Sequence, residues 1–262
     1  MNHAVAALVE TCRQRVPAAV LGDPSLLTSE LVAPILAELR KVGKADVGVL
    51  EPWHWSNEGA GAGAVAGSAA SAAGGPARGG WLDASLNSLL SSPPPAAPRS
   101  VLSREAPGTY YFDIANTALF SIGVFVLGPH NYIPLHDHPN MCVLSKVLWG
   151  SLDVRSYDWA DWTRLDANRK AGGVARVVDD EVTYSEGMIK LLLPNKGGNL
   201  HSFRAANAAP VGVAVLDVIL PPYDEAGGRA CSYYRVQPHV EPGKVTLLKG
   251  EPPEDFEVVN LN

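Results

Sequence analysis

The sequence predicts a mainly β protein, a sandwich or barrel of short antiparallel strands with a small helical cap at its N-terminus. From about Gly108 onward, short apolar or alternating runs follow one another closely, separated by glycine, proline, asparagine and aspartate. No helical period longer than two turns interrupts them, which argues against alternating strands and helices. In the first 50 residues, by contrast, apolar side chains recur at helical spacing.

The composition excludes several classes of protein. The chain has 262 residues, 47% of them hydrophobic and 18% charged, so it can form a packed core. A net charge of -6 without any basic run argues against nucleic acid or anionic membranes as partners. No apolar run approaches the ~18–20 residues of a membrane span, and no secretory signal is visible. Three widely spaced cysteines fit a reducing compartment, so we expect a cytoplasmic location, with the nucleus as an alternative. The protein is also expected to be a monomer.

Residues 1–58 form the expected helical cap. Val5, Leu8 and Cys12 lie on one stripe of a first helix. A second helix is expected to begin near Thr28 or Ser29, both favourable N-cap residues, and to end near Gly43. A small cap of this kind packs on a larger domain.

Residues 59–98 form a low-complexity insertion. Its first part, 59–80, is almost wholly glycine, alanine and serine, and a second break at 91–98 carries three consecutive prolines. We expect a flexible linker or loop whose shortening costs little stability, because it holds almost nothing to bury. Residues 99–262 are then the barrel core, which forms one domain with the cap.

The strands of this core are expected where apolar runs stand between turn residues. Residues i and i+2 of a strand lie on the same face, so each run should present one side to the interior. The expected strands are 110–114, 121–127, 142–149, 152–157, 174–178, 188–193, 211–220 and 231–236.

A His-x-His pair stands apart among the seven histidines. On a strand His136 and His138 share a face, and Asp137 points the other way. Two imidazoles on rigid backbone are suited to bind a metal, although ordinary surface or core histidines are an equal alternative. Asp137 is better explained as a hydrogen-bonding neighbour or a surface carboxylate than as a third ligand.

A third histidine, His201, follows the glycine pair 197–198, which allows a tight turn that aims the chain into the barrel. This arrangement resembles the two cupin motifs. In the first motif a glutamate ligand and then a glycine follow His-x-His; here Gly150 occupies the glycine position, but Cys142 and Val143 stand where the glutamate would be. Such a three-histidine site leaves the full charge on a divalent metal.

The wider sequence resembles the plant cysteine oxidases and their relatives, the 2-aminoethanethiol (cysteamine) dioxygenases. The resemblance implies that His136, His138 and His201 bind one Fe(II), and that O2 oxidises the N-terminal cysteine of a protein or peptide to cysteine sulfinic acid. The product would feed the N-degron pathway, so the protein would sense oxygen. The segments that carry the resemblance are 10–13, 45–48, 120–127, 133–139, 143–159, 216–223, 231–235 and 252–256.

Two departures from the family pattern stand near the histidines. Asn140 replaces the usual glycine after His-x-His-Pro; asparagine tolerates left-handed backbone, so we expect the turn to be kept. His130 and Asn131 replace small residues before the first metal histidine. We expect this replacement to alter the rim of the pocket and with it the fine substrate preference.

Two further residues are expected at the site. Asp217 lies in an apolar strand, where an unpaired carboxylate is costly, and the resemblance places it beside the iron, where it would bind the substrate amine or a metal-bound water. A buried structural aspartate is the alternative. Tyr223 matches a family tyrosine near the pocket, with an ordinary core aromatic as its alternative.

Two of the cysteines are expected to be ordinary packed side chains. Cys231 and Tyr233 would share a strand face, and relatives form a Cys–Tyr crosslink in this region, but two ordinary packed side chains are favoured here. Cys142 is better explained as a small core residue than as a ligand.

The lack of a cationic residue on one strand narrows the class of substrate. Enzymes of the free-cysteine type carry an arginine on the strand before His-x-His to pair the substrate carboxylate, and residues 121–127 contain no arginine or lysine. Peptide N-terminal cysteine or cysteamine therefore fits better than free cysteine. The competing hypotheses are a three-histidine zinc hydrolase and a non-enzymatic cupin binding module.

Overall fold

A computed structural model describes residues 2–48, 108–206 and 212–261. The expectations for the insertion at 59–98 lie outside the described residues, as does the boundary of the cap at residue 58. Within the described ranges, no helix is both long and apolar enough to cross a membrane.

The N-terminal cap contains the two predicted helices, α1 (His3–Arg15) and α2 (Ser29–Lys41). Thr28 is the N-cap of α2, and its hydroxyl accepts a hydrogen bond of 3.2 Å from the backbone N–H of Leu31, as the sequence predicted. Two short 3₁₀ helices, η1 (Ala18–Leu21) and η2 (Pro24–Leu26), join them.

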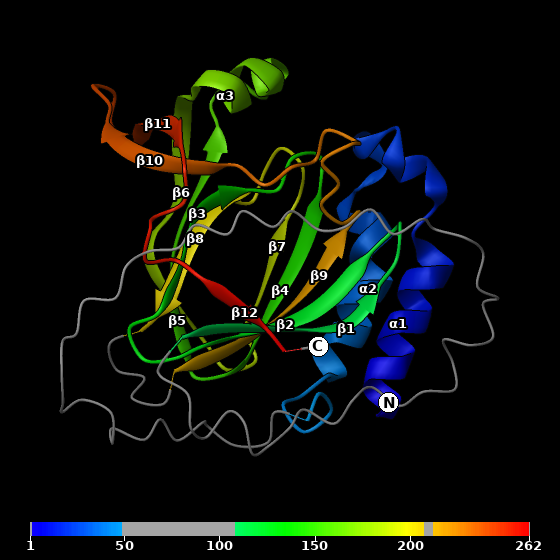
Figure 1. Ribbon diagram of the computed structural model, residues 1–262. Helices are drawn as coiled ribbons and strands as arrows, with labels where there is room; N and C mark the ends of the chain where they lie inside the picture. The colour runs from blue at the N-terminus through cyan, green and yellow to red at the C-terminus, as the bar shows by residue number, and fades with distance from the viewer. Residues whose placement is uncertain (1, 49–107, 207–211, 262) are drawn as a thin grey trace, which may run out of the picture.

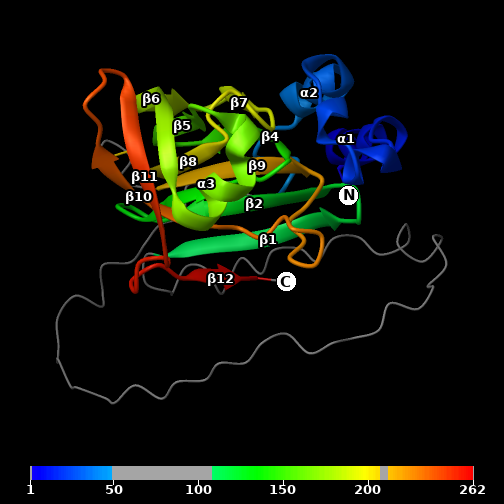
Figure 2. The same ribbon diagram turned by 90° about the horizontal axis from the view of Figure 1, so that it is seen from above.

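The barrel core consists of two sheets that face each other. The first, sheet A, has six strands, and its outer side carries α1 and α2 (Figures 1 and 2). Its strands in spatial order are β12 (Val258–Asn260), β1 (Thr109–Asn116), β2 (Ser121–Leu127), β9 (Val213–Leu220), β4 (Cys142–Trp149) and β7 (Ile189–Leu192).

The second sheet, sheet B, curls until its two edges meet, where Tyr233 pairs with His136. A short helix, α3 (Leu165–Ala171), preceded by η3 (Trp162–Arg164), packs on β11 and β6 at the top of Figure 1. The strands of sheet B in spatial order are β10 (Tyr233–Pro238), β11 (Lys244–Gly250), β6 (Gly173–Ser185), β5 (Ser151–Trp159), β8 (Leu200–Ala205) and β3 (Tyr132–Asp137).

Alternation along the strands divides the core in two. On β4, Leu144 points outward and packs with the cap, whereas Val147 points inward and packs with Phe203 of sheet B. The inward cluster fills the space between the two sheets, which we call the interior. The histidines stand at one end of this interior.

Most predicted strands are present, but some boundaries are wrong, and β6 continues to Ser185, well beyond the predicted end at residue 178. The segment 231–236 was expected to be a strand, but β10 begins at Tyr233, so Cys231 and Tyr233 do not share a strand face. The Ser232 carbonyl still accepts the Asp137 N–H at 3.1 Å, but the Ser232 N–H donates to the Asp137 carboxylate at 2.8 Å instead of to a strand carbonyl. The sequence had given no expectation for β8, β11, β12 or α3.

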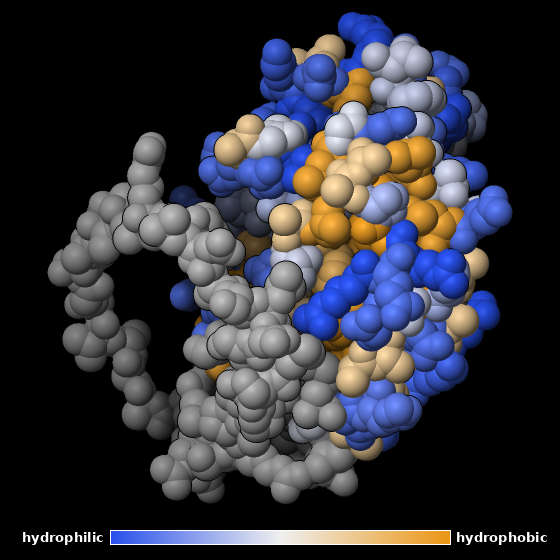
Figure 3. Space-filling view, turned by 90° about the vertical axis from the view of Figure 1, so that its right-hand side faces the viewer, coloured by the Kyte–Doolittle hydropathy of each residue, from blue (hydrophilic) through white to orange (hydrophobic). Residues whose placement is uncertain are grey.

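A cavity of about 760 Å³ lies between η2, α3 and the turn 193–196. Asn140 lines it, but none of the three histidines does. Figure 3 shows the side of the molecule that carries the cap, where apolar side chains gather on the upper half among polar ones; Leu21 and Leu26 of η1 and η2 are among the exposed apolar residues of the protein.

Candidate metal centre

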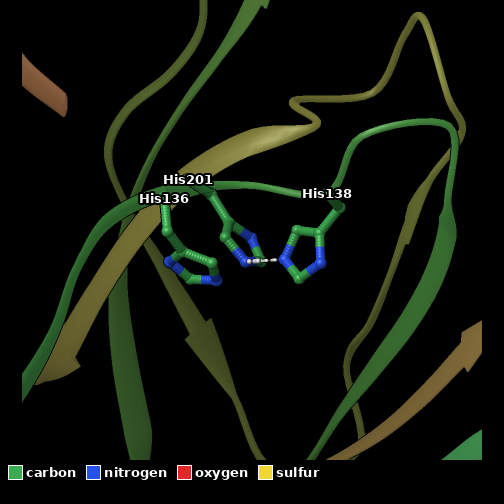
Figure 4. A group of neighbouring side chains, drawn as sticks. All are labelled: His136, His138 and His201. Carbon is green, nitrogen blue, oxygen red and sulfur yellow. Dashed lines mark hydrogen bonds between the residues drawn. The ribbon is translucent and has the colours of Figure 1, made fainter. Parts of the chain in front are cut away.

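Three imidazoles from two adjacent strands converge at the end of the interior (Figure 4). His136 lies in β3, His138 just beyond it, and His201 near the start of β8, directly opposite His136 in the register. One ring nitrogen from each lies within 4.8 Å of the others, and the Nε2 atoms of His138 and His201 are 3.0 Å apart. The structure therefore brings together the three histidines that the sequence singled out.

The surroundings keep these rings neutral. All three are buried, and desolvation lowers the pKa of His136 and lowers the pKa values of His138 and His201 well below the ordinary value. For His136, the hydrogen bond to Pro134 only partly opposes this effect. A neutral imidazole offers a lone pair, which metal binding requires.

Hydrogen bonds also fix which nitrogen carries the proton. His136 Nδ1 lies 2.8 Å from the Pro134 carbonyl, which can only accept, so Nδ1 is protonated and Nε2 is left with its lone pair. Tyr223 donates its single hydroxyl proton to the Asp137 carbonyl at 2.8 Å and therefore accepts from His138 Nδ1 at 2.9 Å. Tyr223 thus lies beside the histidines and contacts one of them directly.

A tight turn before His201 is fastened by a carboxylate that sequence reasoning missed. Asp158 of β5 accepts the backbone N–H groups of Gly197, Gly198 and Asn199 at 2.9–3.0 Å. Gly197 and Gly198 have φ angles of 91° and 84°, which confirms the need for glycine. The Asn199 side chain in turn accepts the His138 N–H at 3.3 Å, so one turn positions two of the three histidines.

The turn after His138 also keeps its expected shape. Asn140 has a φ of 57°, so asparagine does take the left-handed conformation at the usual glycine position. Cys142, which begins the next strand, is fully buried, and burial raises the pKa of its thiol to about 12. It is a core residue, as expected.

Asp137 lies between two of the histidines but points away from them, as predicted. It is 1% exposed, so it is not a surface carboxylate. Its oxygens accept from Arg169 Nε at 3.0 Å, Tyr234 at 3.0 Å and the Ser232 N–H at 2.8 Å. The same Arg169 guanidinium donates to the carbonyls of Gly228 and Ala230, which ties α3 to the chain that leads to Cys231. No sequence motif had pointed to Arg169.

Cys231 interacts with two tyrosines beside the centre. Burial raises the pKa of its thiol to about 11, and hydrogen bonding with Tyr223 and Tyr233 partly opposes the rise. The Tyr233 ring lies 6.5 Å from the His136 ring, measured between centroids. A protonated thiol of this kind is poorly nucleophilic.

Asp217 is the buried carboxylate that the sequence predicted on β9. It is 4% exposed, and its Oδ1 has no hydrogen-bond partner within the described ranges. Burial raises the pKa of this carboxyl to about 6, and the nearby Ser145 hydroxyl opposes the rise without reaching hydrogen-bonding geometry. Asp217 and Ser145 are directly opposed on β9 and β4, so they share the inward face.

The donor set fits a divalent metal. Cis ligands about 2.1 Å from a metal would stand about 3 Å apart, close to the 3.0 Å between Nε2 of His138 and Nε2 of His201. The group holds no carboxylate or thiol, so bound imidazoles would leave the metal charge uncompensated. One face of three nitrogen ligands leaves positions open for substrate and is the arrangement of catalytic rather than structural sites.

A β-helical barrel of two facing sheets with three buried, neutral histidines at one end defines a cupin whose interior is able to hold a metal. The PCO_ADO family model matches residues 86–260, and the chain belongs to this family.

Curated relatives carry consistent names. Plant cysteine oxidase 1 of Arabidopsis thaliana is 38% identical over 135 residues, which cover 51% of this chain and 44% of that protein. A probable 2-aminoethanethiol dioxygenase of Dictyostelium discoideum is 39% identical over 127 residues, with 48% and 55% covered. The 2-aminoethanethiol dioxygenase of Homo sapiens is 31% identical over 169 residues, with 58% and 62% covered. The chain thus spans about half the length of the curated relatives it matches.

Solved structures that align with part of the chain include KdgF from Halomonas sp., at a TM-score of 0.31 and 13% identity over 44% of this chain and 81% of that one. A cupin-like protein from Desulfovibrio desulfuricans aligns at a TM-score of 0.30 and 16% identity, covering 44% of this chain and 84% of that one.

Proposed function

We propose that this protein is an Fe(II)-dependent thiol dioxygenase that oxidises an N-terminal cysteine with O2. The observation that carries the proposal is the cluster of three buried, neutral imidazoles without a carboxylate ligand. Both atoms of one O2 molecule are added to the thiol sulfur, which turns R–SH into R–SO2H. Sulfur loses the four electrons that O2 gains, so no other reductant is needed.

The chain's own residues would hold and shape the centre. His136, His138 and His201 would bind the metal, and the contacts of His136 and His138 leave the Nε2 of each unprotonated for this role. Bound iron would supply the activation of O2 and would favour the thiolate form of the substrate. Tyr223 acts through His138, so we assign it a positioning role. Asp217 is proposed to hold a proton on its carboxyl, exchanging it with the substrate amine or a metal-bound water.

The charges around the centre favour a substrate without a free carboxylate. β2 carries no arginine or lysine. Of the two partly buried cations near the histidines, Arg169 is paired with Asp137 and Lys190 with Asp179. Neither is available to bind a carboxylate, so a peptide whose first residue is cysteine fits better than free cysteine. Cysteamine, which lacks a carboxylate, is the second candidate for the same reason.

The names of the curated relatives support the reaction class, and the resemblance extends it to a cellular role. We infer that the sulfinic acid product marks a protein for the N-degron pathway, so that turnover of the enzyme reports oxygen. A monomer in the cytoplasm or nucleus would meet such substrates.

The test uses protein loaded anaerobically with Fe(II) and then exposed to air with three substrates: a Cys-initiated peptide, free cysteine and cysteamine. Mass spectrometry should show a gain of two oxygen atoms on the peptide's N-terminal cysteine, at a kcat/KM far above that for free cysteine. A preference for free cysteine would overturn the substrate assignment. Oxidation of none of them by iron-loaded protein, or activity with zinc alone, would overturn the reaction class.

A further inference from the structure

The strand register places a row of polar residues around the interior at the level of the histidines. In sheet B, His136 is opposite His201, His201 is opposite Ser156, and Ser156 is opposite Asp179. Directly opposed residues share a face, so all four side chains belong to the inward side.

A second row faces it from sheet A. Here Asp217 is opposite Ser145, and Ser145 is opposite Lys190. The two rows are joined at one side, because Lys190 makes an ion pair with Asp179 and donates to the Ser156 hydroxyl at 3.2 Å. The Ser156 hydroxyl donates to the same Asp179 carboxylate. This ion pair lies on the interior of the barrel and is not used by the proposed reaction.

Between the two rows lies a small cavity of about 20 Å³. His201, Ser145 and Lys190 contribute to its lining, and the remainder is apolar or aromatic, as with Val215 and Phe203. A volume of roughly 10–15 Å³ or more, measured in this way, admits one water molecule if polar partners are present.

Two buried atoms at this level lack partners. Ser145 Oγ and Asp217 Oδ1 have no hydrogen bond to any described residue. Lys190 has a third ammonium proton beyond those given to Asp179 and Ser156. Buried polar atoms of native proteins are almost always satisfied, by ordered water where protein does not do so. The cavity therefore has room for one water, a donor in Lys190 and an acceptor in Ser145 Oγ.

We propose that this cavity binds one ordered water, which accepts from Lys190 and donates to Ser145 Oγ, and that a small shift of the Ser145 side chain then lets its hydroxyl donate to Asp217 Oδ1 on the adjacent strand. Lys190 is then a positioning residue that acts on Asp217 through the water and Ser145. The water site is supported by the cavity and the two unpartnered atoms. The effect of the water on turnover rests on the proposed dioxygenase function.

This assignment gives Asp217 a connection to the metal centre. The carboxylate makes no hydrogen bond to any of the three histidines, but the cavity that Ser145 lines is also lined by His201. The water would lie beside His201, and its bond to Ser145 would link this side of the metal centre to Asp217.

The first test is a high-resolution crystal structure of the iron-loaded protein. One density peak should lie in the cavity within hydrogen-bonding distance of both Ser145 Oγ and Lys190 Nζ, and it should be weakened or lost in the Ser145→Ala variant. A wild-type cavity without density, or a water bonded to neither atom, would overturn the proposal. This test needs no turnover, so it fails or succeeds independently of the proposed reaction.

The second test is kinetic. Ser145→Ala should lower kcat for a Cys-initiated peptide by roughly tenfold or more with little change in KM and full iron content, since positioning and not binding is lost. Val143→Ala, on the same face of β4 but outside the cavity lining, controls for core truncation and should keep kcat near that of wild type. Equal kcat for Ser145→Ala and wild type would show that the water has no part in turnover.

The role of Lys190 is tested by removing the ion pair as a unit, because Lys190→Met alone would leave Asp179 unpaired and risk unfolding. The double variant Lys190→Met/Asp179→Asn should fold and show the same kcat loss as Ser145→Ala, and combining it with Ser145→Ala should add little further loss. Lys170→Met, on the exposed surface of α3, is the control. A fully additive loss in the triple variant would contradict a shared water.

Discussion

The two faces of strand β4 differ in how their buried polar groups are hydrogen-bonded. Lys146 points to the outer side, where its ammonium donates to the carbonyls of Leu39, Arg40 and Val42 at 2.6–3.1 Å. Ser145, its neighbour in the chain, points to the interior and has no partner among the described residues. Lys146 therefore fixes the end of α2 to the barrel. Ser145 keeps a free hydroxyl on the side of the strand that faces the metal centre.

The same contrast separates the two buried aspartates. Asp137 has both carboxylate oxygens satisfied by Arg169, Ser232 and Tyr234, whereas Asp217 keeps an unpartnered Oδ1. A satisfied buried carboxylate stabilises the fold, and an unsatisfied one costs stability. Residues that lower the stability of the folded state are expected where they serve the function of a protein, and Asp217 is such a residue.

The largest effect is expected from removing a metal ligand. His201→Ala should abolish iron binding and turnover, because two imidazoles hold the metal too weakly. His239→Ala is the control, since His239 lies away from the centre and bonds Thr246. Metal analysis after anaerobic loading measures the difference. Full iron and turnover in the His201 variant would show that the triad is misassigned.

Asp217→Asn should keep iron and the fold but lose turnover by about a hundredfold or more, because the proton-carrying group is deleted. It should also stabilise the metal-free protein. The pKa of this carboxyl is raised from 3.8 to about 6, so the folded state holds a proton that the unfolded state releases. Wild-type stability therefore falls as pH rises through this window, by about 3 kcal/mol at most, at about 1.4 kcal/mol per pKa unit.

Urea unfolding of the metal-free proteins measures that stability effect. Below pH 3.8 the Asn variant and wild type should be similar, and above pH 6 the variant should be the more stable. Asp137→Asn is the matched contrast and should destabilise, since it disrupts the pairing with Arg169. Wild-type turnover in the Asp217 variant would make that residue structural, and loss of iron would give it a role in holding the metal.

Lys146→Met should lower the free energy of unfolding by about 2 kcal/mol or more, because it leaves buried carbonyls at the end of α2 without a donor. Turnover of the protein that remains folded should be unchanged. Lys41→Met, at the exposed end of the same helix, should cost less than about 0.5 kcal/mol. Equal effects of the two substitutions would show that the Lys146 contacts do not anchor the cap.

The smallest effect is expected from Tyr223→Phe, which removes the acceptor that holds His138 in its tautomer. Iron affinity should fall about tenfold, with partial turnover at saturating iron. Tyr234→Phe removes a hydroxyl bonded to Asp137 but touches no metal histidine, so iron affinity should be unchanged. An iron titration compares the pair, and unchanged affinity in both variants would remove the positioning role of Tyr223.

The sequence predicted well those features that depend on local pattern. Thr28 as N-cap, the strands β2 and β4, the glycine turn and the three converging histidines follow from periodicity, capping and motif spacing. Asp217 was recognised because a carboxylate in an apolar strand is conspicuous.

Features that depend on pairing between distant segments were missed. Asp158 fastens a turn 39–41 residues away, and Arg169 joins Asp137 across 32 residues; neither carries a local signature. The start of β10 was wrong because the Ser232 N–H bonds the Asp137 carboxylate, so only the Ser232 carbonyl pairs with the backbone of β3. A one-dimensional pattern cannot reveal which hydrogen-bonding groups the fold has already used.

The most direct test of the central claim, that the three histidines form a thiol dioxygenase centre, is oxidation of a Cys-initiated peptide under isotopically heavy O2 in ordinary water. The account predicts a sulfinic acid that carries two heavy oxygen atoms, formed with the uptake of one O2 per peptide, and no such product with the His136→Ala variant. A product with one heavy atom or none, or the same product from the variant, would contradict it.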